Sequence, residues 1–216
     1  MPHHMRLFAD RLAAGEALEL GAGPVRALYV RDGGATIVSG GSVAALAPNS
    51  AWQGAGALAL TGAAGGAQIL RFELVAAETD HGAPIIVSPP LALDPRGQYL
   101  LRCDRVEFPP GGVAYRHTHQ GPGLRCLVAG AIRIDAGGAS HAHRPGEAWF
   151  ENGVDPVFAA GSERETTAFI RVMVLPRAII GKSSIRYVDE ADKDKPRRQR
   201  YQIYLDHPIE LPGSRT

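Results

Sequence analysis

Hydrophobic and polar residues alternate in short runs along most of the chain, and a glycine or proline soon ends each run. The 26 glycines and 16 prolines are spread over the whole length instead of forming one linker. Alternation with a period of two between turn residues predicts short β-strands joined by tight connections. We therefore expect an all-β protein of the sandwich or barrel type. Residues 7–19 could form either a strand or a short helical turn.

The expected strands form two series, separated by a connection over residues 80–97 that is dense in glycine and proline. The expected strands are 25–30, 35–39, 42–47 and 67–76, then a short one at 84–88 in the connection, then 98–108, 113–119, 124–130, 131–135, 140–143, 147–151, 156–160 and 167–176. A charged run at 189–200 is expected to be solvated, and residues 200–211 resemble one more strand.

The two series resemble each other when the sequence is shifted by 97 residues. The shift places Gly33 on Gly130 and Trp52 on Trp149, and the register runs without a gap between them. This periodicity indicates an internal duplication. We expect an N-terminal module at 1–80, a C-terminal module at 98–176, and a tail at 177–216 that could supply a swapped strand to another subunit.

The strongest chemical signal is a pair of histidines, His117 and His119, in an expected strand that follows a Pro-Gly-Gly turn. Residues i and i+2 of a strand point to the same face, so both imidazoles can face the interior and bind one cation. Imidazole suits zinc, copper, iron and nickel. The shift of 97 residues places Leu20 and Ala22 at these positions, so only the second module has groups suited to chemistry.

These residues stand in a pattern that resembles the cupin superfamily. Gly111 is followed by five residues, then by His117 and His119, and Gly130 closes this first motif. Residues 145–150, Pro-Gly-Glu-Ala-Trp-Phe, resemble the opening of the second motif. The resemblance implies a bicupin with a degenerate N-terminal copy: two β-jelly-roll (cupin) barrels in one chain. It also implies a homodimer, for which the tail strand is suited.

The sequence departs from the cupin pattern at two of the four usual metal ligands. Gly123 stands where the first motif has glutamate, and residues 144–206 contain no histidine, so Asp155, Pro156 or Val157 lies near the place of the second-motif histidine. In the implied jelly roll, the strand that begins near Gly123 runs antiparallel to 147–151. Glu151 could then fill the space at 123 as third ligand. Gln120 is a weaker alternative, because an amide binds transition metals poorly.

Other polar residues near the motif have both a functional and a structural interpretation. Tyr115 shares the alternation of the histidines and could orient a substrate or donate a proton, or simply fill the core. Arg125 could clamp a carboxylate substrate, or face water as most arginines in strands do. His141 and His143 also alternate, and we expect them to be partly exposed.

Composition narrows the setting. The net charge of +1 gives no indication of nucleic acid or an anionic membrane as partner. The two cysteines form no paired motif, and no apolar run has the length of a membrane helix or a signal-peptide core, so we expect a cytoplasmic protein with reduced thiols. A chain of 216 residues suits one large domain or two small ones.

Two functions follow from these residues. The first is a metal-binding cupin, a dioxygenase or other metal-dependent enzyme acting on a small organic substrate, with Fe, Mn, Ni, Cu or Zn held by His117, His119 and Glu151. The second is a non-catalytic cupin that binds or senses a small molecule. The intact histidine pair favours the first, and the two missing ligands favour the second. A structural dimer module is a third and weaker interpretation.

Overall fold

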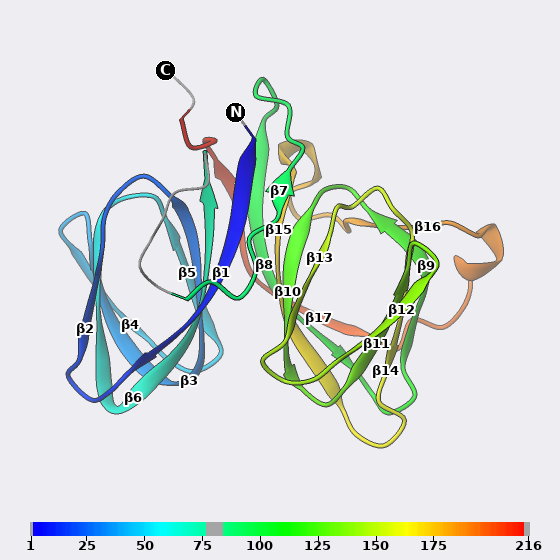
Figure 1. Ribbon diagram of the computed structural model, residues 1–216, viewed down its shortest axis with the longest axis horizontal. Coiled ribbons are helices and arrows are strands. Elements are labelled where there is room, and N and C mark those ends of the chain that lie inside the picture. Colours follow the sequence, from blue (N-terminus) through cyan, green and yellow to red (C-terminus); the bar gives the residue numbers. More distant parts are fainter. Residues whose placement is uncertain (1, 77–83, 214–216) are drawn as a thin grey trace. The chain divides into compact units, whose positions relative to one another are not determined.

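The computed structural model describes residues 2–76 and 84–213, and it confirms the all-β expectation (Figure 1). Two short 3-10 segments, η1 (Arg177–Ile179) and η2 (Glu190–Asp192), are the helical elements of this described part. The chain forms two compact units, Met1–Gly97 with Ile209–Thr216, and Gln98–Pro208. No helix in the described part is long and apolar enough to span a membrane.

The first unit is one seven-stranded sheet with the order β4-β3-β6-β1-β7, in which β2 pairs with β6 and β5 pairs with β3. Its strands are β1 (His3–Leu12), β2 (Ala17–Leu20), β3 (Val25–Ser39), β4 (Ser42–Leu46), β5 (Ser50–Gly54), β6 (Leu58–Val75) and β7 (Pro90–Leu91). Residues 7–19 therefore form the end of β1, a turn at 13–16 and most of β2, with no helical turn. In the expected strand at 84–88, Val87 makes only an isolated bridge to Leu7. Residues 80–83 of the expected connection lie outside the described residues.

The second unit has two open five-stranded sheets, ordered β13-β10-β15-β8-β17 and β12-β11-β14-β9-β16. Its strands are β8 (Tyr99–Phe108), β9 (Val113–His119), β10 (Gly123–Ala129), β11 (Ile132–Ala136), β12 (Ala139–His143), β13 (Ala148–Glu151), β14 (Val157–Gly161), β15 (Thr167–Pro176), β16 (Ile185–Tyr187) and β17 (Arg200–Ile209). One hydrophobic core joins both sheets: Phe108 and Leu127 pack from the first, and Ile134 and Ala159 from the second. This is the layered arrangement of a jelly roll.

Strand pairing follows the same plan in both units. β1 and β3 pair with β6 in the first unit, as β8 and β10 pair with β15 in the second, and β5 pairs with β3 as β13 pairs with β10. Matched by this register, the corresponding residues are Leu20 and His117, Leu46 and His143, Trp52 and Trp149, and Gly54 and Glu151. Each of these pairs is separated by 97 residues, the same shift that aligns the two halves of the sequence. The agreement supports an internal repeat.

Residues 177–208 of the C-terminal tail belong to the second unit. β17 is the edge strand beside β8. Arg102 on β8 donates two hydrogen bonds to Asp206 on β17, at 2.9 and 2.8 Å, and Asp206 also accepts the backbone N–H of Gly181. The charged run at 189–200 is mostly exposed, although Asp192 and Gln199 are buried. The tail thus contributes both a strand and, through β16, a wall beside the histidines.

A buried ion pair crosses the sheet that carries β10. Arg171 on β15 donates to both carboxylate oxygens of Asp104 on β8, at 3.0 and 2.7 Å, and both side chains are buried. Taking one partner away would leave the other charge buried without compensation, which is far more costly than losing an exposed pair.

Replacing Asp104 with alanine should therefore destabilise the second unit by about 3–5 kcal/mol. The free energy of unfolding, measured by urea titration with circular dichroism, checks this value. Glu190→Ala is the control, since its pair with Lys193 is exposed and should contribute nothing measurable. Equal effects of the two substitutions would contradict the role given to the buried pair.

Candidate metal centre

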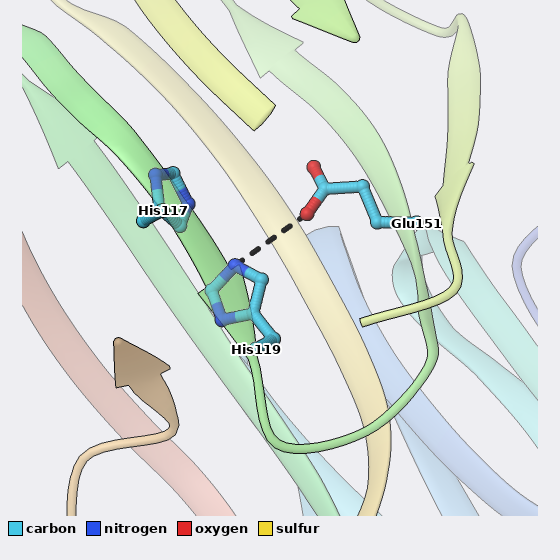
Figure 2. A group of neighbouring side chains, drawn as sticks. All are labelled: His117, His119 and Glu151. Carbon is cyan, nitrogen blue, oxygen red and sulfur yellow. Dashed lines mark ion pairs between the residues drawn. The ribbon is translucent and has the colours of Figure 1, made fainter. Parts of the chain in front are cut away.

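Three side chains that could bind a metal converge inside the second unit. His117 and His119 lie on β9 with 5% and 6% of their surface exposed, and Glu151 is the last residue of β13. One ligand atom from each lies within 4.8 Å of the other two. Figure 2 shows both imidazoles on one strand and the Glu151 carboxylate reaching toward them from another. His119 Nε2 is 3.4 Å from Glu151 Oε2.

The carboxylate reaches this place through the antiparallel pairing of β10 and β13. Glu151 is directly opposite Gly123, the position where the cupin motif has glutamate. A Cβ atom added at Gly123 would be 2.4 Å from the Val172 carbonyl oxygen and 2.6 Å from Met173 Cγ. No side chain fits at 123 unless β15 moves, and the carboxylate nearest this position is that of Glu151 on the neighbouring strand. That Glu151 serves as a metal ligand stays a prediction.

Hydrogen bonds on the far sides of the imidazoles fix their orientation. His117 Nδ1 lies 2.7 Å from the Tyr115 carbonyl oxygen. Since a carbonyl only accepts, Nδ1 carries the proton, and the lone pair is on Nε2. His119 Nδ1 is 3.3 Å from Ser184 Oγ, while its Nε2 faces Glu151. Histidines that bind metals in proteins are held by such contacts of their second nitrogen.

Burial keeps both histidines in the neutral form that a metal requires. Desolvation lowers the pKa of His117, and the charges of Arg171 and Arg125 lower it further, against the hydrogen bond to Tyr115 and the charge of Glu151. Desolvation, followed by the charges of Arg171 and Arg125, lowers the pKa of His119 well below its usual value. Two neutral imidazoles are therefore ready to donate lone pairs.

Glu151 has a hydrogen bond at one carboxylate oxygen and an ion pair at the other. Trp149 Nε1 donates to Oε1 at 2.9 Å. Arg125 Nη2 lies 2.8 Å from Oε2, yet Oε2 accepts no aligned hydrogen bond from the described residues. Arg125 thus forms a close ion pair with Oε2 without an aligned hydrogen bond. Oε2 also faces His119 Nε2, so a cation bound by the two histidines could take this oxygen as a third ligand.

Arg125 faces the interior, as one of the two interpretations expected. It is fully buried, and burial lowers its pKa to about 10 against the attraction of Glu151. Its Nη1 donates to the Gly123 carbonyl oxygen at 2.6 Å. The guanidinium is therefore occupied within the protein, and its role toward a substrate carboxylate stays a prediction.

Tyr115 does not follow the strict alternation on which its expected place depended. A register shift in the pairing of β9 with β14 makes Ala114, rather than Tyr115, the buried residue before His117. The Tyr115 ring is half-buried and has the Lys195 ammonium 4.4 Å from its centroid. Its carbonyl oxygen is what Tyr115 supplies to the histidines. A catalytic role of its hydroxyl stays a prediction.

The remaining candidates lie apart from the three converging ligands. Gln120 donates to the Ser183 carbonyl oxygen and accepts from Arg186, so its amide is used elsewhere. His141 is exposed and His143 half-buried, as expected. Sequence reasoning missed Ser184 altogether, because it belongs to the tail, far from either motif.

No protein-family model matches the sequence, and the curated proteins contain no significant match. Solved structures do match. A cupin 2 conserved barrel domain protein from Leptotrichia buccalis is 18% identical, with a TM-score of 0.50, and the match covers 80% of this chain and 84% of that one. A mutant of Bacillus subtilis oxalate decarboxylase OxdC is 12% identical, with a TM-score of 0.68, over 90% and 74%. AerE from Microcystis aeruginosa is 9% identical, with a TM-score of 0.56, over 80% and 87%.

The chain has the cupin fold. At such low identity the likeness concerns the fold alone, and function has to be argued from the site. One of the matched structures of the oxalate decarboxylase is described by its Mn(II) centres.

The steric argument at Gly123 can be tested directly. Gly123→Ala should destabilise the protein by about 1–3 kcal/mol, because its Cβ would overlap β15. Urea unfolding measures the change. Gly65→Ala is the matched control on a strand, since a Cβ there meets nothing within 4 Å. If alanine were tolerated at both positions, the account of why the carboxylate comes from β13 would be wrong.

Proposed function

We propose that this protein is a metal-dependent bicupin whose second unit holds one divalent transition metal through His117, His119 and Glu151. The observation that carries the proposal is the convergence of His117, His119 and Glu151, whose ligand atoms lie within 4.8 Å of one another, with His119 Nε2 3.4 Å from Glu151 Oε2. Two histidines and one carboxylate are the donor set of mononuclear non-haem iron enzymes, and manganese accepts similar ligands. In the first unit, Leu20 and Gly54 replace two of these ligands, so we assign it no metal.

The reaction we favour is metal-dependent oxygenation of a small organic molecule, with isomerase or lyase chemistry as the alternative within the same class. A bound metal would act as Lewis acid or redox centre and leave positions for substrate. The chain's own groups have other tasks. The Tyr115 carbonyl and Ser184 hold the imidazoles in orientation, and Arg125 holds the carboxylate of Glu151 in place through an ion pair.

A specific observation also favours a second candidate, a non-catalytic binder or sensor of small molecules. The ion pair of Arg125 with Glu151 already balances the charge that a metal would use. In addition, the cupin pattern usually has four metal ligands, and the group found among the described residues has three. Under this alternative the cavity still binds a metabolite, but no metal is needed. In either case, a homodimer is our proposal for the assembly.

Metal analysis of the purified protein decides between these candidates. We expect about one equivalent of Fe, Mn, Ni, Cu or Zn per chain by plasma mass spectrometry after desalting, since three inward ligands give a defined site. His117→Ala combined with His119→Ala should abolish this content, and Glu151→Gln should reduce it. His207→Ala is the control, because His207 is exposed. Metal-free wild-type protein, or metal retained by the double variant, would overturn the proposal.

The ion pair makes a separate prediction. Arg125→Met should destabilise the metal-free protein, because it leaves the Glu151 carboxylate buried without its cation. Adding Mn²⁺ or Zn²⁺ should then raise the melting temperature more in this variant than in wild type, as the metal replaces the missing charge. Thermal unfolding with and without the metal measures both effects. An equal rise in both proteins would mean that Glu151 takes no part in binding.

A further inference from the structure

Side chains of β12 and β13, the edge strands of the second unit's two sheets, line a cavity of about 360 Å³. Apolar residues form much of its wall: Ile134, Ala136, Trp149, Phe150 and Val157. Glu151 lines it as well, and of the three converging ligands it is the one that the cavity touches. This volume lies at the small end of the range for ligand sites, and it suits one ring with a short substituent.

Aromatic rings connect the cavity wall to the Glu151 carboxylate. The His143 ring stacks on Trp149, with centroids 4.8 Å apart and planes 22° from parallel. Trp149 in turn donates its Nε1–H to Glu151 Oε1. The Phe169 ring packs edge-on against Trp149, with ring centroids 5.2 Å apart. Trp149 is buried, whereas His143 and Phe150 are only partly buried and can contact a ligand. A flat, aromatic ligand suits such a wall.

The charge of the cavity restricts the ligand further. Glu151 and Asp155 are its acidic side chains, and neither arginine nor lysine lines it. Burial lowers the pKa of His143, with the charge of Glu147 acting against this, so its ring is neutral near pH 7. Arg125, which the sequence offered as a clamp for a carboxylate, is fully buried behind the lining, where its ion pair balances the charge of Glu151. Asp155, which no arginine or lysine of the lining balances, therefore disfavours an anion in the cavity and favours a cation or a neutral donor.

We propose that this cavity binds a small aromatic ring carrying an amino or hydroxyl group, and that it excludes aromatic carboxylates. As a substrate class, the assignment rests on the proposed metal centre, since Glu151 belongs to both. As a binding site, it stands on His143, Trp149 and Asp155 alone. The first unit offers an internal comparison, because Leu46 replaces His143 and the Trp52 ring lies over Gly54.

The test uses three molecules of nearly equal size: benzylamine, benzyl alcohol and benzoate. The chain has two tryptophans, so a ¹⁵N-labelled sample gives two indole N–H signals, and Trp52→Phe assigns them. Titration should shift the Trp149 signal and leave that of Trp52 in place. We expect benzylamine and benzyl alcohol to bind at least roughly tenfold more tightly than benzoate, because charge repulsion acts on the anion alone.

Variants identify the residues responsible. His143→Leu should weaken benzylamine binding roughly fivefold by removing a ring of the wall, whereas His207→Ala should not. Asp155→Asn should reduce the ratio of the affinities for benzylamine and benzoate, because it removes a negative charge. The affinity for benzyl alcohol, which is uncharged, should not change. An unchanged circular dichroism spectrum of each variant verifies that the second unit still folds.

The outcomes separate this proposal from the proposed function. The double variant of His117 and His119 should lose metal but still bind benzyl alcohol. Metal-free wild-type protein that shows the Trp149 shift would overturn the metal centre and keep the cavity. A metal-loaded protein whose Trp149 signal does not respond, or which prefers benzoate, would overturn the cavity and keep the metal centre.

Discussion

The candidate site depends on one constraint, the register in which β10 and β13 pair. Side chains alternate between faces along a strand, so a slip of one residue would turn Glu151 away from the histidines. The pairing of Glu151 with Gly123 fixes the carboxylate on the inner face. Gly123 is itself required, since β15 leaves no room for a Cβ there. Gly123, which departs from the cupin motif, therefore lies opposite Glu151 and leaves room for the carboxylate of that residue.

Charge balance in the interior determines whether such a site can hold a cation. Burial is the main reason why the pKa of His119 is lowered, and the positive charges of Arg171 and Arg125 lower it further. The same two charges would repel a metal ion. Asp104 offsets Arg171 through two hydrogen bonds, and Glu151 offsets Arg125. The buried pair on β8 and β15 therefore supports the site from a distance, because it cancels a charge that a divalent ion would otherwise meet.

Local pattern was enough to predict part of this arrangement. Alternation predicted that His117 and His119 share a face. The place of Glu151 near Gly123 needed more than local pattern, because it followed from the antiparallel strands of the jelly roll that the cupin resemblance implies. Tyr115 failed the same reasoning, because a bulge in β9 adds a residue that no alternation rule includes. Ser184 could not be foreseen, since only the path of the tail brings it to His119. Spacing along one strand is readable in a sequence, whereas contacts made by distant segments are not.

The two units show what an acidic residue does in this fold when no ligand is needed. In the first unit, Glu73 is buried and accepts hydrogen bonds from both Arg26 and Arg71 at 2.8 Å, so its charge is satisfied within the protein. In the second unit, the half-buried Glu151 accepts one hydrogen bond from Trp149 and forms an ion pair with Arg125. The same fold thus pairs an inward carboxylate with arginine in both units. Two neutral imidazoles lie beside the carboxylate in the second unit alone among the described residues, and this neighbourhood, rather than the acidic residue by itself, is what a bound cation would need.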